Sequence, residues 1–340
     1  MKRAVVLFNL GGPDQLASVQ PFLFNLFSDK AIIGLPQPLR WLVAKLISTR
    51  RAPVAQEIYG HIGGKSPLLE LTQAQARALE TALKAENPAD DFKVVIAMRY
   101  WHPFAAEAIA ELKAFAPDEV TLLPFYPQFS TTTTGSSVLD WEKQARAHDF
   151  AVHTKTVCCY PTDRIYVAAH RDLLQSYVSE PNTRVLFSAH GLPKKVVDGG
   201  DPYQWQVEQT VAATVDALGK PDLDYVTCYQ SRVGPLEWIG PSTDDEIERA
   251  GQEGKSLVVV PIAFVSEHSE TLVELDIEYA ELAEKAGVVS YKRVPALGTN
   301  PHYIDALKAA VLGAGDGVAP VGGKRICPGT CGKCPADQAA

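Results

Sequence analysis

Short apolar runs rich in β-branched residues alternate with longer stretches of helical periodicity along most of this chain. The runs that predict strands are residues 3–9, 92–98, 119–125, 183–189, 224–229 and 256–264. Most of their residues are apolar, which is typical of parallel strands buried on both faces of a sheet. They form one group before about residue 150 and another after about residue 180. This arrangement predicts an α/β fold with two doubly wound halves.

Length and composition set the domain count and exclude one class of partner. A chain of 340 residues, 46% of them hydrophobic and 21% charged, is long for a single core, so two domains are expected. We place the first half at residues 1–155, the second at 156–315 and a cysteine-rich tail at 316–340, with residues 151–163 as a crossover. The net charge of −8 argues against a nucleic-acid partner, which would select for a basic face.

The apolar segments bear on localisation. The N-terminal run breaks at residues 11–13, Gly-Gly-Pro, so it predicts a strand rather than a signal peptide. No stretch approaches the roughly 20 apolar residues of a membrane helix, and we expect a cytoplasmic protein. Residues 32–47 are apolar, with Arg40 and Lys45 as their charges. This stretch fits either a buried helix pair or a peripheral contact with the inner face of the membrane.

His190 lies at the carboxyl end of a predicted strand, directly before Gly191. Ligands of doubly wound folds bind beyond the carboxyl ends of the strands. An imidazole at this point suits proton transfer or metal binding, although a loop histidine with satisfied ring nitrogens is an alternative interpretation.

An acidic helix is predicted after the last strand, from Ser266 as N-cap to Gly287 as C-cap. The spacing i, i+3, i+7, i+11 places four carboxylates in one band of this helix, and they are Glu267, Glu270, Glu274 and Glu278. A solvated surface is the usual explanation of such a band. Because the band begins next to His268, it also fits an exchangeable divalent-cation site, in which like charges raise the pKa of some members.

Three of the six cysteines lie close together in the tail, at Cys327, Cys331 and Cys334. Proline and glycine separate these thiols, so metal chelation is an economical way to order the segment. A four-ligand site needs one more thiol, from Cys158, Cys159 or Cys228. By spacing alone, zinc and an iron–sulfur cluster fit equally well. A disulfide fits less well, because the rest of the chain has an intracellular character.

Several long segments, taken together, resemble the ferrochelatase family, which inserts ferrous iron into a porphyrin to make haem. They are FNLGGPD, RRAP…YGHIGGKSP, MRYWHP, FYPQFSTTTTGSS, FSAHGLP, GDPY, QSRVGPLEWIGP and PIAFVSEHSETLVELDIEY, in the family's order. The resemblance covers nearly the whole chain. It implies a chelatase-like α/β fold with two Rossmann-like halves facing a porphyrin cleft. It also implies a lyase that inserts Fe²⁺ into protoporphyrin IX, with release of two protons, as the last step of haem biosynthesis.

The resemblance also implies the roles of individual residues. His190 and Glu270 are implied as the metal-binding pair, and His268, Glu274 and Glu267 as further catalytic residues along an acidic path. The implied porphyrin-binding residues are Arg51, Tyr59 and Ser66 for the propionates, and Leu10, Arg99, Tyr100 and Trp238 around the macrocycle. Two pyrrole protons must leave, so neutral His190 is the expected base, and wall residues such as Leu10 and Trp238 are candidates for bending the ring. The route of iron, from the His190 side or along the carboxylates, stays open.

Some ferrochelatases carry a [2Fe–2S] cluster on C-terminal cysteines, and this favours a cluster over zinc. In some members the fourth ligand lies in the segment matching FSTTTTGSS, where this chain has Thr131. We therefore expect Cys158 as the fourth ligand, because it lies in the crossover, where a surface tail can reach it. Cys228 ends a strand and is expected to be a buried apolar residue. The cluster is expected to be structural, because insertion of a divalent ion consumes no electrons.

Other functions are compatible with parts of the sequence. Within the family, coproporphyrin and cobalt are alternatives to protoporphyrin and iron. An iron–sulfur redox or regulatory protein would use the tail as its working part. A bilobal binding protein shares the two-domain outline, but such proteins are usually exported. The expected partners are a porphyrin and ferrous iron, and the oligomeric state, a homodimer included, stays open.

Overall fold

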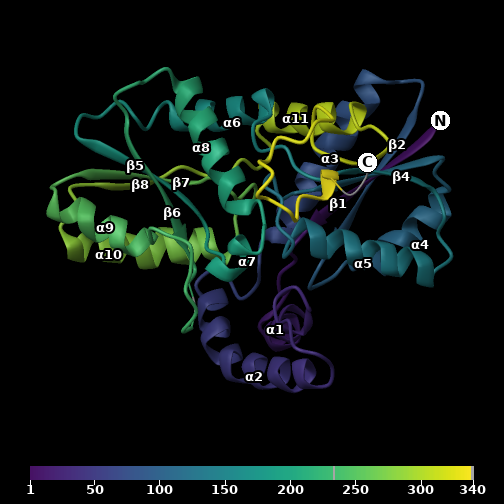
Figure 1. The fold of residues 1–340 in the computed structure, drawn as a ribbon, viewed down its shortest axis with the longest axis horizontal. Coiled ribbons are helices and arrows are strands. Elements are labelled where there is room, and N and C mark those ends of the chain that lie inside the picture. The colour runs from purple at the N-terminus through teal and green to yellow at the C-terminus, as the bar shows by residue number, and fades with distance from the viewer. Residues whose placement is uncertain (233, 338–340) are drawn as a thin grey trace. The chain divides into compact units, whose positions relative to one another are not determined.

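The computed structural model describes residues 1–232 and 234–337 (Figure 1). The described chain divides into two compact units. The first contains Met1–Cys159, Leu307–Arg325 and Pro335–Asp337, and the second contains Tyr160–Ala306 and Ile326–Cys334. The chain therefore returns to the first unit after completing most of the second. The predicted divisions at residues 155 and 315 do not coincide with these limits.

The first unit is built on a five-stranded parallel sheet in the order β2-β1-β3-β4-β9. Its strands are β1 (Lys2–Asn9), β2 (Asp91–Met98), β3 (Glu119–Pro124), β4 (His153–Val157) and β9 (Gly317–Ala319). β1 pairs with both β2 and β3, so its residues are buried on both faces, as continuous apolar runs predict. The β4 and β9 strands extend the sheet through Lys155–Gly317 pairing.

Helices cover both faces of this sheet (Figure 1). On one face α4 (Ala105–Phe115) and α5 (Thr134–Ala147) bury Val6, Phe8 and Trp141 in one core cluster. On the other lie α3 (Leu68–Glu86) and the second half of α11 (Pro301–Leu312). A short 3₁₀ turn, Leu16–Ser18, leads into α1 (Val19–Ser28), which packs against α2 (Leu39–Gly60). None of the helices in the described ranges is long and apolar enough to cross a membrane.

The second unit is built on a four-stranded parallel sheet in the order β6-β5-β7-β8. Its strands are β5 (Thr183–His190), β6 (Asp224–Gln230), β7 (Ser256–Pro261) and β8 (Tyr291–Arg293). Val185 and Phe187 of β5 face one core cluster, and Leu186 faces the other. This alternation buries both faces of the strand, because successive side chains point to opposite sides.

One face of the second sheet is covered by α6 (Arg164–Leu174) and α8 (Tyr203–Leu218), which follows the short α7 (Lys194–Asp198). The opposite face is covered by α9 (Thr243–Gln252), by the π-helix η2 (Glu270–Glu278) and by α10 (Tyr279–Ala286). The two parallel-sheet α/β units thus agree with the predicted fold class. The predicted crossover at residues 151–163 is wrong in part, because it contains β4.

Candidate active site

His190 ends β5, and its imidazole meets the first carboxylate of the π-helix. Its Nδ1 atom lies 2.9 Å from Oε2 of Glu270, and the two side chains are 41% and 26% exposed. Burial acts to raise the pKa of Glu270, but the charge and hydrogen bond of His190 outweigh it and lower that pKa to about 2. Burial acts to lower the pKa of His190, but the charge of Glu270 outweighs burial and raises this pKa. The pair therefore favours imidazolium and carboxylate.

The carboxylates are carried by a π-helix rather than by the predicted α-helix. In η2 the hydrogen bonds run from i to i+5, which widens each turn, so residues four or five apart lie near one another along its face. The predicted N-cap Ser266 is wrong, because the helix begins at Glu270 after a turn in which Thr271 Oγ1 accepts from the His268 N–H group at 3.0 Å. The predicted C-cap Gly287 is confirmed, with a left-handed φ of +81° after α10.

Glu274 lies in a network of donors at the carboxyl end of β6. Ser231 donates to it twice, from its backbone N–H at 2.8 Å and from its hydroxyl at 2.5 Å, and Gln230 donates from Nε2 at 3.0 Å. Tyr279 donates to the same carboxylate at 3.2 Å. Burial and the charge of Glu270 still raise the pKa of Glu274, in the direction the like-charge argument predicts. The pKa of Glu270 is therefore lowered while that of its neighbour Glu274 is raised.

Ser231 connects these two carboxylates and was missed by sequence reasoning. Its hydroxyl lies 3.3 Å from Glu270 Oε2 as well as close to Glu274, and its backbone has a φ of +61°. A non-glycine residue in this left-handed region is strained, and such strain often marks a functional position. Its position at the end of a strand was the available signal.

His268 and Glu267 have different partners. The buried His268 has its Nε2 3.9 Å from Glu270 Oε2 and its Nδ1 3.2 Å from the Ser266 carbonyl oxygen. Burial lowers the pKa of His268 despite the charge of Glu270. Glu267 instead accepts from Arg293 Nη1 at 2.8 Å and from the Ala296 N–H at 2.9 Å. Burial acts to raise the pKa of Glu267, but Thr271 and Arg293 outweigh it, so Glu267 serves an ion pair.

Trp238 packs beside the residue that follows His190. A Cβ atom placed on Gly191 would lie 3.4 Å from the Trp238 ring, and Trp238 pairs with Pro193 in an antiparallel bridge. The indole ring thus lies against the backbone that leaves β5. This places Trp238 next to the metal-site candidate.

The predicted substrate residues of the first unit gather partly in one hydrophobic cluster. Tyr59 and Tyr100 are buried in it, and Leu10 packs against it. The exposed Arg51 lies with its guanidinium 5.9 Å from the ring centre of Phe27, which borders the same cluster. Ser66 lies beside the loop that follows β1, where its N–H donates to the Pro13 carbonyl at 2.8 Å.

Asp29 organises two of these residues and carries no sequence signal. Its Oδ2 atom accepts from Arg99 Nη2 at 2.8 Å, from the Tyr100 hydroxyl at 2.9 Å and from Ser136. Burial acts to raise the pKa of Asp29, but the Arg99 charge and the hydrogen bonds outweigh it and lower that pKa. Arg99 and Tyr100 are therefore held by a buried carboxylate.

The three tail thiols are buried in the second unit, with Cys327 and Cys331 7% exposed and Cys334 3% exposed. Cys334 hydrogen-bonds to Cys327, which also accepts from Gln206 Nε2 at 3.0 Å. This buried set of soft donors suits an iron–sulfur cluster chemically. Within residues 1–232 and 234–337, however, no three histidine, cysteine, aspartate or glutamate side chains are arranged to hold a metal ion.

The predicted fourth ligand, Cys158, belongs to the first unit. It is buried with Cys159 and Phe129, and its Sγ lies 3.8 Å from that of Cys159. Cys228 is buried in the core of the second unit beside Leu186 and Leu257, as its position at the end of a strand predicts.

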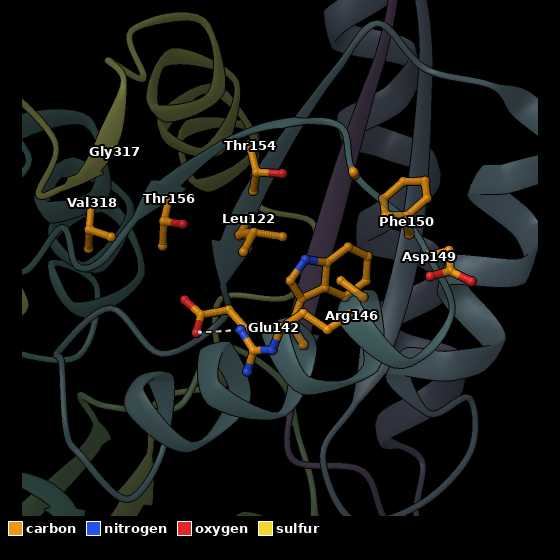
Figure 2. A pocket seen from close by; sticks show the side chains of 12 residues that line it. Leu122, Glu142, Arg146, Asp149, Phe150, Thr154, Thr156, Gly317 and Val318 are labelled. Atoms are coloured by element: carbon orange, nitrogen blue, oxygen red, sulfur yellow. Dashed lines mark ion pairs between the residues drawn. The ribbon is translucent and has the colours of Figure 1, made fainter.

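A separate cavity of about 480 Å³ lies within the first unit, between α5 and the strands β3, β4 and β9 (Figure 2). Leu122, Trp141 and Val318 supply apolar lining, and Glu142 and Arg146 form an ion pair at 3.9 Å beside it. The predicted site residues do not occur among the residues that line this cavity. It is therefore distinct from the site around His190.

Comparison with solved structures supports the fold. SirB from Bacillus subtilis, solved with Fe³⁺, superposes with a TM-score of 0.54 at 12% sequence identity, covering 91% of this chain and 93% of SirB. At this identity the likeness concerns the fold alone, and it confirms the predicted class of two parallel-sheet α/β halves.

Sequence relatives identify the family. A profile of the ferrochelatase family matches residues 2–314. The ferrochelatase of Phenylobacterium zucineum is 56% identical over 340 residues, covering 98% of each chain. That of Caulobacter vibrioides is 55% identical over 347 residues, covering 100% of this chain and 99% of the relative. The chain belongs to the ferrochelatase family, and its prediction as a metal-chelatase lyase is confirmed at that level.

Proposed function

We propose that this protein inserts Fe²⁺ into protoporphyrin IX to form protohaem, with release of two protons, as the last step of haem biosynthesis. The observation that supports it best is the His190–Glu270 pair at the carboxyl end of β5 in a member of the ferrochelatase family. An imidazole and a carboxylate are ligands for ferrous iron and acceptors for protons. The same pair thus meets both demands of metal insertion.

The proton route follows the pKa differences. His190 takes a pyrrole proton, and its raised pKa makes it a better base once it is neutral. Glu270 keeps its charge because its pKa is low, and it stabilises the imidazolium. Glu274, with its raised pKa, is the carboxylate suited to receive a proton next. Burial lowers the pKa of His268, which favours its neutral form, and we assign it to the surroundings of Glu270, whose Oε2 lies 3.9 Å from its Nε2.

For the porphyrin we keep the assigned residues. Leu10 and Trp238 would line the macrocycle, and Arg51, Tyr59 and Ser66 would hold propionates through a guanidinium and two hydroxyls. Arg99 and Tyr100 would support the residues around the macrocycle, because Asp29 holds both of them in place. Glu267 is assigned to supporting the turn before η2 through Arg293.

For the tail we propose a structural [2Fe–2S] cluster on Cys327, Cys331, Cys334 and Cys158. The buried tail thiols support three of these ligands. Purified protein should contain iron and sulfide in equal amounts and absorb in the visible range. Cys158→Ser should lose the cluster, with Cys159→Ser as the matched control. A cluster that survives in Cys158→Ser, or zinc without sulfide in the native protein, would contradict this assignment.

We also propose a cytoplasmic protein that contacts the inner membrane surface peripherally through residues 32–47. Apolar side chains of α2 support this, because Leu39 is 53% exposed, Trp41 48% and Leu42 55%. Arg40 and Lys45 beside them would favour anionic lipid.

The activity itself is tested by anaerobic incubation with a metal and a porphyrin, followed by the absorption spectrum of the product. Protohaem from Fe²⁺ and protoporphyrin IX is the expected product. Coproporphyrin in place of protoporphyrin, and Co²⁺ in place of Fe²⁺, test the two alternatives within the family. Failure with every pair of metal and porphyrin would overturn the proposal.

A further inference from the structure

The cysteine tail contacts Gly200, in the segment that joins α7 to α8, and Gln206, in the first turn of α8. The Gly200 carbonyl accepts from the Lys333 N–H at 3.0 Å, and the Gln206 side chain donates from Nε2 to Cys327 Sγ at 3.0 Å. All four residues belong to the second unit. The tail is therefore attached to a protein surface at both ends of its cysteine-containing stretch.

Gly200 permits the backbone contact with Lys333. Its φ is +96°, and a Cβ atom added to it would lie 3.0 Å from the backbone nitrogen of Gly332 and 3.4 Å from that of Lys333. Backbone atoms cannot swing aside as the end of a flexible side chain can. An alanine here would therefore meet both an unfavourable backbone conformation and the tail itself.

Gln206 supplies a directed contact. It lies in the first turns of α8, is fully buried, and points an amide N–H at the first of the three tail sulfurs. A buried amide donor needs an acceptor, because leaving it unpaired is unfavourable. Besides its interactions within the body of the unit, this side chain thus fixes where the Cys327 sulfur lies.

The tail is also folded upon itself. The Cys331 N–H donates to the Pro328 carbonyl at 2.9 Å, and the Cys334 N–H donates to the Cys331 carbonyl at 3.0 Å. These turns bring Cys334 into a hydrogen bond with Cys327.

We propose that Gly200 and Gln206 form a receptor on the second unit that seats the cysteine tail and positions Cys327 whether or not a metal is bound. Gly200 lets the tail backbone approach, and Gln206 is the positioning residue for Cys327. These contacts are made by the protein alone, so the receptor does not depend on the reaction catalysed or on the identity of the metal. It differs from the expectation that chelation alone orders the tail.

Hydrogen–deuterium exchange of the full-length chain, prepared with chelator and reductant and verified to contain no metal, tests the receptor. Peptides covering residues 326–334 should be protected in the native sequence. Gln206→Met keeps a long unbranched side chain without the donor, and should speed exchange there about threefold to tenfold, which corresponds to one hydrogen bond. Gly200→Ala should speed it more, because it alters the backbone as well.

Two variants of the same helix serve as matched controls. Gln204→Met removes an amide that bonds to Glu208, and Gly219→Ala introduces alanine at a φ of +63° where nothing lies within 4 Å. Both should leave the tail protected, and exchange in β5 should stay slow in every variant. A tail that exchanges as fast as an unstructured peptide in the metal-free native protein overturns the proposal. Unchanged protection in both Gly200→Ala and Gln206→Met overturns it equally.

Discussion

His190 Nδ1 and Glu270 Oε2 lie 2.9 Å apart, and each holds the other in its charged form. The raised pKa of His190 contributes stability that is present below its unfolded value of about 6.5 and is lost as pH rises through the folded value. The lowered pKa of Glu270 contributes stability that is present above about 4.3 and is lost as pH falls toward the folded value. The pair therefore stabilises the fold most between these two unfolded values.

The pH dependence of metal insertion should report this pairing. Neutral His190 is the proton acceptor, so kcat/KM should rise as pH increases through its raised pKa. Glu270→Gln removes the charge that raises this pKa and leaves the burial that lowers it, so the rise should move to lower pH. Glu274→Gln should move it less. An unchanged profile in Glu270→Gln, measured on residual activity, would show that another group is titrating.

His190→Ala should abolish insertion while the porphyrin still binds. Loss of a general base costs about 10² to 10⁴ in rate, and removal of a metal ligand adds to this. The thermal midpoint should fall modestly, because Glu270 loses the partner that keeps it charged, while the protein should stay folded because the imidazole is partly exposed. Stopped-flow insertion kinetics and porphyrin fluorescence quenching measure the two effects separately. Insertion at near-native rate would remove His190 from the reaction.

Ser231→Ala should destabilise the protein and Ser231→Gly should destabilise it less. Both lose the hydroxyl that donates to Glu274, at about 1 to 3 kcal/mol for a buried acceptor left short of a partner. Only glycine relieves the left-handed backbone at φ +61°, by about 1 kcal/mol. Urea unfolding of both variants checks the order. Equal losses would mean that the backbone of Ser231 is not strained.

Asp29→Asn should lower the free energy of unfolding by about 3 kcal/mol, because it leaves the Arg99 guanidinium without its buried partner. Tyr100→Phe, which removes one hydrogen bond to the same carboxylate, should cost about 1 kcal/mol. The Asp29 pKa is lowered, so its contribution is present above about pH 4 and is lost at more acidic pH. The difference between native protein and Asp29→Asn should therefore shrink in acid; a pH-independent difference would contradict this.

Leu42→Ser should weaken sedimentation with anionic lipid vesicles, by about fivefold for the roughly 1 kcal/mol of apolar surface that the membrane would cover. Leu139→Ser is the matched control, because Leu139 of α5 is 67% exposed and lies outside α2, where Leu42 is 55% exposed. Both variants should keep the native thermal midpoint. Equal weakening by the two would mean that binding does not depend on α2.

The long strands could be predicted because burial on both faces leaves a continuous apolar run. β8 and β9 have three residues each, and β4 reads HTKTV with a half-buried pattern, so neither length nor hydrophobicity marks them. Their pairing depends on neighbours that lie far away in the sequence.

In the candidate site, the proximity of His190 and Glu270 agrees with their places in the sequence, because His190 ends β5 and Glu270 lies in the segment that follows β7 of the same sheet. The π-helix could not be predicted, since its residues fit an α-helix equally well by composition. The separation of Glu267 from Glu274 depends on Arg293, which follows in β8. Asp29 and Gln206 act through partners 70 and 121 residues away, and local sequence carries no trace of such contacts.

Strand β9 has a consequence for how this protein is made. It borders β4 through the Lys155–Gly317 register, yet the ribosome reaches Gly317 only after translating nearly all of the second unit. In the nascent first unit the β4 edge therefore stays unpaired until β9 is made. Unpaired strand edges can pair with strands of other chains. Slow translation or premature termination before Gly317 should expose newly made chains to aggregation, and chaperones would be needed over that interval.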